Sequence, residues 1–230
     1  MEDKMPFDFE SMIPQNIGDK HIACVLLVDT SGSMMGAPIN ELNNGLIEFG
    51  KALEQDAQAR GCADVCVISF NSYVQMEVPF CPAMNYSAPK LTANGLTSMN
   101  EAIIAGLNAL EERKNLYKSY GIPYYRPWIF LMTDGEPTDT NREGAAKQML
   151  GDAIRNKKVN FFPMGIGNAN IQKLMSYTEG GSRMVLKATA SNFKEAFVWL
   201  SSSISAVTNS FDAEKVSIPS PPPMIEIEVI

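Results

Sequence analysis

An apolar run that stops abruptly at an acid constrains the fold of this chain more than any other feature. Residues 24–28 are all apolar, and Asp29, Ser31 and Ser33 follow within five positions. Such a run, bounded by turn residues, is typical of a strand that is buried on both faces. Pro38 suits the first position of a helix, and a helical pattern follows it. Because open α/β sheets bind ligands outside the carboxyl ends of their strands, these three oxygen-bearing side chains lie where such a fold keeps its site.

The rest of the chain alternates strand patterns with helix patterns. Strands are expected at 22–29, 64–70, 73–78, 127–134, 159–166 and 183–186, and helices at 38–59, from 98 onward, 141–156, 170–176 and 192–209. The two-residue turn at 71–72 is too short for a crossover, so the strand at 73–78 is expected to be an antiparallel edge strand. The alternation predicts a doubly wound, Rossmann-like α/β fold, with a mostly parallel sheet and helices on both faces.

Local signals predict where the helices begin and end. Gly61 is expected to end the first helix. Ser98 with Glu101, and Thr140 with Glu143, have the spacing of a capping box, in which each side chain accepts a hydrogen bond at the helix start. These two pairs are therefore predicted to cap the helices that follow them.

The chain divides into one domain with an extension at each end. Residues 1–20 contain no periodic pattern and are expected to form an N-terminal arm, followed by a domain over 21–210. Residues 211–230 are predicted to be a proline-rich extended tail, with polyproline structure over 217–223. Residues 225–230 alternate apolar and acidic side chains, a strand pattern that could pair with a sheet edge of this domain or of a partner.

Composition excludes several classes of partner. The formal net charge is −7 and no basic run occurs, which argues against a nucleic-acid-binding surface. No apolar run approaches the roughly 20 residues that span a bilayer. The first residues lack the apolar segment of a signal peptide, so a cytoplasmic protein is expected. The four cysteines show no C-x-x-C spacing and are expected to be reduced and structural.

Five oxygen-bearing side chains are candidates for one metal site: Asp29, Ser31, Ser33, Thr97 and Asp134. Thr97 comes from a long loop, and Asp134 ends another predicted strand. Oxygen ligands without His or Cys suit Mg²⁺, with Mn²⁺ and Ca²⁺ as alternatives. Two carboxylates and three hydroxyls would leave the ion electrophilic, so that it could accept an Asp or Glu from a partner. The competing interpretation is that Asp and Ser after a strand only cap the next helix or form an Asx turn.

The motif Asp29-x-Ser31-x-Ser33, together with Thr97 and Thr133-Asp134-Gly135, resembles the metal-ion-dependent adhesion site (MIDAS) of the von Willebrand factor type A (vWA) family. The resemblance covers residues 20–210. It implies the strand order 3-2-1-4-5-6, with the strands that end at Asp29 and Asp134 adjacent at the topological switch point. It also implies that the three hydroxyls bind the metal directly and that the two carboxylates bind it partly through water.

Within this family, the segment from Ser31 to Gly36 and the following Pro38 resemble bacterial proteins of the tellurium-resistance TerY type. That resemblance implies a role in a stress-response or metal-resistance system, beside kinases or phosphatases. The sequence therefore predicts a protein-binding module that captures a partner's carboxylate through a divalent metal, without catalysis and without nucleic-acid or membrane binding.

Two other functions stay open from the residues alone. A Mg²⁺- or Mn²⁺-dependent phosphohydrolase would use the same oxygen ligands, although the only candidates for a general base are loop acids such as Glu136 and Asp139. A metal-free scaffold subunit could instead make its contacts through the tail. The only histidine, His21, lies at the opposite end of the first strand from Asp29, which excludes a Ser-His-Asp hydrolase.

Overall fold

The computed structural model describes residues 13–179, 184–210 and 218–229. Within them, one sheet has the strand order β3-β2-β1-β4-β5-β6-β7. The strands are β1 (Ile22–Asp29), β2 (Ala63–Phe70), β3 (Val74–Pro82), β4 (Trp128–Thr133), β5 (Asn160–Ile166), β6 (Met184–Ala188) and β7 (Glu226–Val229). Strands β1, β2, β4, β5 and β6 are parallel, and β3 is antiparallel at one edge. The expected fold and the order 3-2-1-4-5-6 are confirmed, and β7 adds an antiparallel strand at the other edge.

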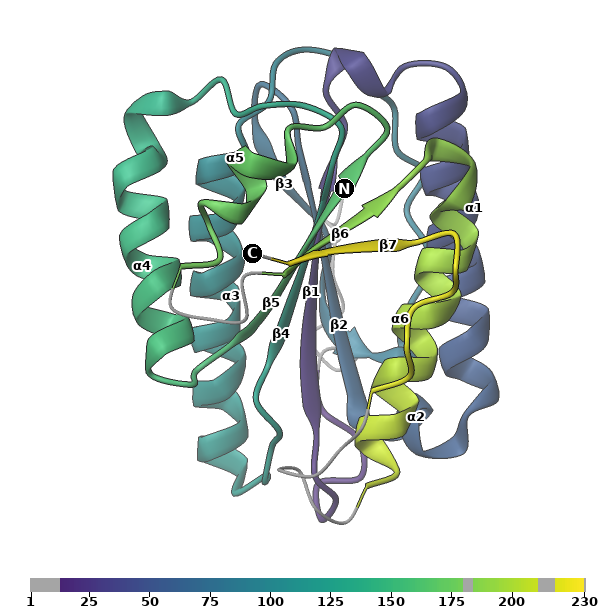
Figure 1. The fold of residues 1–230 in the computed structure, drawn as a ribbon. Coiled ribbons are helices and arrows are strands. Elements are labelled where there is room, and N and C mark those ends of the chain that lie inside the picture. The colour runs from purple at the N-terminus through teal and green to yellow at the C-terminus, as the bar shows by residue number, and fades with distance from the viewer. Residues whose placement is uncertain (1–12, 180–183, 211–217, 230) are drawn as a thin grey trace, which may run out of the picture.

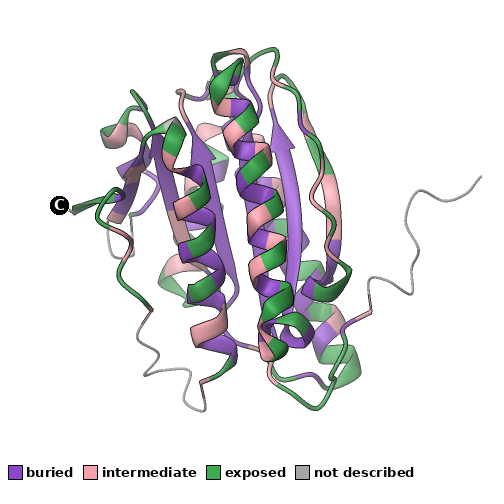
Figure 2. Cartoon of the chain, turned by 90° about the vertical axis from the view of Figure 1, so that its right-hand side faces the viewer, coloured by how far each residue is buried: buried purple, intermediate pink, exposed green. Residues whose placement is uncertain are grey.

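Helices cover both faces of this sheet. They are α1 (Ala37–Gln55), α2 (Ala57–Cys62), α3 (Met99–Tyr120), α4 (Glu143–Arg155), α5 (Ile171–Met175) and α6 (Phe193–Thr208). Figure 1 shows α1, α2 and α6 on one side of the strands and α3, α4 and α5 on the other. Strands β1, β2 and β4 are buried along their whole length, whereas the edge strands β3 and β7 carry exposed residues, and each long helix turns an exposed face to solvent (Figure 2). None of the helices in the described residues is both long and apolar enough to cross a membrane.

Alternation along β1 explains why two cores form. Cys24, Leu26 and Val28 belong to the core beneath α1 and α6, while Val25 and Leu27 belong to the core beneath α3 and α4. Successive side chains of a strand point to opposite faces, so an uninterrupted apolar run fills both cores at once. The central strand thereby ends at a fixed position between two helical layers.

The predicted single helix over 38–59 is wrong, because the chain leaves helical geometry at Asp56. That residue has extended backbone angles (φ −94°, ψ 114°) and ends α1. Its carboxylate accepts hydrogen bonds from the backbone nitrogens of Gln58 (3.0 Å) and Ala59 (2.8 Å) and so caps α2. Gly61 consequently lies inside α2 and does not end a helix.

The tail packs on its own domain. Strand β7 pairs with β6, and Ile225, just before it, is 3% exposed. The Trp199 indole nitrogen on α6 donates to the Pro219 carbonyl oxygen at 2.7 Å, and the Asn192 amide donates to the Met224 carbonyl oxygen at 3.1 Å. The strand pattern at the end of the chain therefore completes this domain's sheet, while 211–217 and residue 230 lie outside the described residues.

Candidate metal centre

The candidate residues gather at the carboxyl edge of β1 and β4. These strands are parallel neighbours, with Val28 opposite Met132. Asp29 is the last residue of β1, and Asp134 directly follows the end of β4. The helices that follow these strands, α1 and α4, cover opposite faces of the sheet (Figure 1). The site therefore lies at the topological switch point, where doubly wound sheets leave a crevice.

Asp29 is held rigidly and is fully buried. Its Oδ1 accepts a hydrogen bond from the Ser31 backbone nitrogen at 2.8 Å, and its Oδ2 accepts one from the Thr133 hydroxyl at 2.5 Å. Burial raises the pKa of the Asp29 carboxyl to about 6, an effect that these hydrogen bonds oppose and the nearby Asp134 reinforces. Both oxygens are thus oriented by neighbours, and one of those neighbours is the residue that ends β4.

Hydroxyl groups connect the two strands across the edge of the sheet. The Ser31 and Ser33 hydroxyl oxygens lie 3.0 Å apart, and the Ser33 hydroxyl donates to Asp134 Oδ1 at 2.6 Å. Asp29, Ser31, Ser33 and Asp134 therefore form one continuous chain of contacts. The predicted adjacency of the strands that end at Asp29 and Asp134 is confirmed, while metal binding by these residues stays a prediction.

Thr97 reaches the same cluster from the loop before α3. A Cβ placed on Gly135 would lie 3.7 Å from the Thr97 hydroxyl oxygen and 3.8 Å from that of Ser33, so the two hydroxyls flank this glycine. Thr138 fixes the backbone of Thr97 through two hydrogen bonds. The Thr138 hydroxyl accepts from the Thr97 nitrogen at 3.1 Å, and the Thr138 nitrogen donates to the Thr97 carbonyl oxygen at 2.9 Å. The loop that carries Asp134 therefore also positions Thr97.

Asp139 has a role that sequence reasoning missed. The predicted capping box is wrong, because the Ser98 side chain makes no capping bond. Instead, the Asp139 carboxylate accepts from the backbone nitrogens of Asn100 (3.2 Å) and Glu101 (2.8 Å), and Glu101 pairs with Arg142 at 2.6 Å. A side chain that caps a helix from a distant loop produces no local sequence pattern, so the sequence could not predict this cap.

The second predicted cap is also wrong, because Arg142 precedes the first residue of α4 and no side chain caps it. Glu143 instead forms ion pairs with Lys147 at 2.7 Å and Lys173 at 2.9 Å. A short 3-10 turn over Thr140–Arg142 takes up the residues that were expected to start the helix. This end of α4 is tied to α5 through charge rather than through a capping box.

A sequence profile of the von Willebrand factor type A domain matches residues 24–198. The chain belongs to this family. Domains of the family typically bind other proteins, and many hold a divalent cation at a MIDAS. The search of curated proteins gave no match to this vWA domain.

Several solved structures share the fold at low sequence identity. The pilus adhesin SpaC from Lactobacillus rhamnosus GG is 16% identical, with a TM-score of 0.66 over 84% of this chain and 31% of that one. The ArnB paralog VWA2 from Sulfolobus acidocaldarius is 20% identical, with a TM-score of 0.56 over 78% and 45%. Proximal thread matrix protein 1 from the mussel byssus, with a zinc-occupied MIDAS motif, is 15% identical, with a TM-score of 0.52 over 81% and 48%. This chain spans less than half of each of these proteins.

The donor set of the vWA domain fits a hard divalent cation. It consists of two carboxylates and three hydroxyls on three segments, and the carboxylates are already oriented by hydrogen bonds. In the described residues no three His, Cys, Asp or Glu side chains come together as a metal-binding cluster, and the candidate site itself contributes only two carboxylates beside its hydroxyls. Oxygen-only donors favour Mg²⁺, Mn²⁺ or Ca²⁺ over softer metals.

The loops around the candidate site are joined to one another. The Gly32 nitrogen donates to the Gly95 carbonyl at 3.0 Å, and the Leu96 nitrogen donates to the Ser72 hydroxyl at 3.0 Å. The β1–α1 loop, the β2–β3 turn and the loop before α3 therefore form one connected surface. Met34 is buried beneath it, whereas Met35 is 59% exposed.

Proposed function

We propose that this vWA domain binds one divalent cation through Asp29, Ser31, Ser33, Thr97 and Asp134 and uses it to capture a carboxylate from a protein partner. The observation that carries the proposal is the unbroken contact chain from Asp29 through Ser31 and Ser33 to Asp134. An Asx turn explains only the bond between Asp29 and the Ser31 nitrogen. Helix capping does not explain the serine contacts, because neither serine hydroxyl caps α1 and the carboxylate of Asp134 lies in contact with Ser33.

The proposed ligands and their neighbours have different roles at the site. Asp29 and Asp134 supply negative charge from two adjacent strands, and the hydroxyls of Ser31, Ser33 and Thr97 supply neutral oxygens between them. When bound, the cation would offer an electrophilic position to a partner's Asp or Glu. Thr133 and Thr138 hold Asp29 and Thr97 in place, so little reorganisation is required on binding.

Exposed apolar side chains around the site support protein binding. Met35, Tyr73 and Leu96 are 59%, 80% and 60% exposed, more than the other large hydrophobic residues in the described part of the chain. They lie on the three loops that hydrogen bonds connect beside Ser33 and Thr97. Exposed apolar residues that cluster beside a polar site favour a partner surface with an apolar residue next to its acid.

We further propose that the domain acts in the cytoplasm without catalysis, as a member of the TerY type, in a stress-response or metal-resistance system beside a kinase or phosphatase. The sequence from Ser31 to Gly36 supports the subfamily. His21, the chain's only histidine, is buried against Asp64 at 3.2 Å, at the far end of β1 from the candidate site. It is therefore out of reach as a general base there.

Calorimetric titration tests the metal site directly. Chelator-stripped protein is titrated with Mg²⁺, Mn²⁺, Ca²⁺ and Zn²⁺, the last because a structural relative holds zinc. Saturable binding of one ion per chain is expected for at least one metal, with loss of binding in Ser33→Ala and Asp134→Asn. The matched controls are Ser202→Ala and Asp152→Asn, both on exposed helix faces. Equal affinities in the site variants and the controls would refute the metal site.

A peptide library tests the partner's chemistry. Peptides that bind in the presence of metal are compared with versions in which Asp or Glu is replaced by its amide. Metal-dependent binding that the amide abolishes, and that Leu96→Ala weakens without changing metal affinity, is the expected result. Binding that survives both the chelator and the amide would contradict carboxylate capture.

A further inference from the structure

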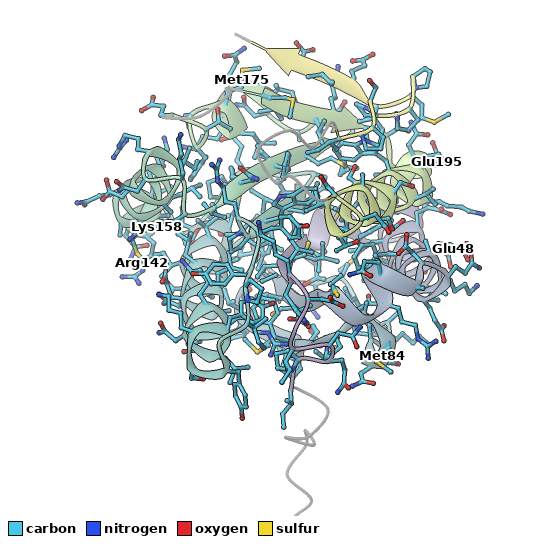
Figure 3. All side chains as sticks on the ribbon, turned by 90° about the horizontal axis from the view of Figure 1, so that it is seen from below. Glu48, Met84, Arg142, Lys158, Met175 and Glu195 are labelled. Carbon is cyan, nitrogen blue, oxygen red and sulfur yellow. The ribbon has the colours of Figure 1, made fainter. Side chains whose placement is uncertain are left out.

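A cavity in the described structure lies at the opposite edge of the sheet from the candidate metal centre. Its volume is about 820 Å³, and it is lined by the segments that precede β1, β4 and β5. Because these strands are parallel, their starts lie together and far from Asp29. The eight residues of β1, at about 3.3 Å each, place roughly 25 Å between the two sites. Figure 3 views the molecule from this end and labels Lys158.

Five basic residues line this cavity: Lys20, Lys114, Arg126, Lys157 and Lys158. No Asp or Glu is among the described lining residues, although the whole chain carries a net charge of −7. Four of the five form no ion pair in the described parts of the structure, and Lys114 pairs with Glu111 at 2.5 Å. Cations gathered in a concave site without acids focus positive potential, which attracts anions.

Contacts position these cations individually. Arg126 donates from Nη1 to Asn160 Oδ1 at 3.1 Å, which orients its guanidinium at the start of β5. The Lys20 ammonium lies 4.3 Å from the centre of the Tyr125 ring. Lys114 is only 6% exposed but pairs with Glu111, whereas Lys20 is half-buried and forms no ion pair in the described residues. Because charge interactions strengthen as water is excluded, a partly buried cation binds an anion more strongly than an exposed one does.

Lys157 occupies a backbone position that favours glycine. Its φ is +54°, in the left-handed region. The Lys157 nitrogen donates to the Ile154 carbonyl at 2.9 Å, and the Lys158 nitrogen donates to the Ala153 carbonyl at 2.8 Å. These two bonds form a Schellman motif at the end of α4, in which the left-handed residue is usually glycine. A lysine costs stability there, so its presence points to a role for its charge.

We propose that this cavity binds a small anion that carries two or more phosphate groups, such as a nucleoside diphosphate or an inorganic polyphosphate. The charge of the four cations without an ion pair exceeds what one phosphate neutralises, and the volume exceeds what one phosphate fills. Both sources share the same chemistry, namely adjacent phosphates held by ammonium and guanidinium groups. The site is independent of the metal-binding function proposed above.

Titration of metal-free protein with pyrophosphate, ADP and orthophosphate tests this site. Metal is removed on a chelating resin and the buffer is Tris chloride, so that neither a cation at the other site nor a polyanionic chelator interferes. We expect saturable binding of one pyrophosphate or ADP per chain, weaker binding of orthophosphate, and affinity that falls as salt rises. Equal affinities for pyrophosphate and ADP would identify inorganic polyphosphate as the ligand source, and tighter ADP binding a nucleotide.

Variants separate charge from fold stability. Lys157→Gly is expected to raise the midpoint of thermal unfolding, because glycine adopts left-handed backbone angles without strain. It is also expected to weaken anion binding, because the positive charge is lost. The double variant Lys157→Gly, Lys158→Gln should bind at least about tenfold more weakly. Lys194→Gln, an exposed cation outside the cavity, is the matched control and should change nothing.

Three results would overturn the proposal. The first is the lack of saturable binding at millimolar pyrophosphate and ADP. The second is binding that Lys194→Gln weakens as much as the double variant does, because this would show attraction to the surface charge in general. Binding that Ser33→Ala abolishes would likewise place the anion at the metal centre and not in this cavity.

Discussion

At the scale of single residues, Asp29 must be buried to lie at the end of β1, although burial destabilises its charged form. A buried carboxylate is costly, yet its position at the end of a fully buried strand is what brings it to the switch point. The structure meets that cost only in part, through bonds from Ser31 and Thr133, so the pKa of the carboxyl stays raised at about 6. This residue should therefore make the stability of the metal-free protein depend on pH.

The contribution of Asp29 to the free energy of unfolding of the metal-free protein is expected to fall as pH rises from about 4 to about 6. Asp29 has a pKa of about 6 in the folded chain against an ordinary value of 3.8, so the folded state holds the proton that the unfolded state has lost. The effect is fully present below the lower value and is lost as pH rises through the higher one. Its size should be about 2 to 3 kcal/mol, measured by urea unfolding at each pH.

Asp29→Asn should remove this pH dependence, because the amide cannot ionise and its oxygen can still accept from the Ser31 nitrogen. Asp152→Asn, on the exposed face of α4, should keep the wild-type profile. If the profiles of Asp29→Asn and the wild type are parallel between pH 4 and pH 7, burial does not raise this pKa in solution.

At the scale of elements, one loop serves both α3 and the candidate site. Asp139→Ala removes the carboxylate that caps α3, and we expect it to lower the free energy of unfolding by about 1 kcal/mol, up to 2. It should also weaken metal binding, since Thr97 lies just before that helix and is held by the neighbouring Thr138. Urea unfolding and metal titration measure the two effects.

Asp152→Ala controls for the loss of an exposed carboxylate elsewhere and should affect neither quantity by a comparable amount. If Asp139→Ala lowers stability but leaves metal affinity unchanged, the loop caps α3 without positioning Thr97. That result would separate the two roles that the hydrogen bonds assign to this loop.

The packing of α1 against α6 depends on one glycine. A Cβ on Gly45 would lie 2.3 Å from a ring carbon of Phe197, which is fully buried and packs on Phe49. Gly45→Ala should therefore lower the free energy of unfolding by about 1 to 3 kcal/mol, despite alanine's better helix propensity. Gly144→Ala, near the start of α4 with open space around it, should be neutral or stabilising when both variants are measured by urea unfolding. Similar shifts in the two variants would contradict close helix contact at Gly45.

Helix boundaries show where sequence reasoning at this scale succeeds and fails. Periodicity predicted every long helix, because the apolar stripe that faces the sheet is written into the local sequence. It could not predict the break at Asp56, which looks like any polar position on a helix surface. Nor could it predict the cap from Asp139, because that bond joins residues about forty positions apart. Caps made by tertiary contacts leave no local pattern.

At the scale of the whole molecule, the two candidate sites differ in how far the sequence predicts them. Asp29, Ser31 and Ser33 form one motif, and Asp134 ends a second apolar run, so their meeting follows from the strand order. The basic cavity has no such signal. Its cations come from separate segments, and only the parallel sheet brings the starts of β1, β4 and β5 together. The net charge of −7 would by itself predict that the chain repels anions.

The C-terminal strand β7 covers the edge of β6, which would otherwise offer unpaired backbone groups to another chain. Ile225 is 3% exposed and Ile227 is 44% exposed on the same short segment, which provides a matched pair. Ile225→Ala should lower the free energy of unfolding by about 2 kcal/mol or more and shift Trp199 fluorescence to the red, because the indole loses cover as the Pro219 segment detaches. Ile227→Ala should change both quantities little. If the two variants behave alike, β7 is not held on β6 in solution, and that edge is then open to pair with a strand from a partner.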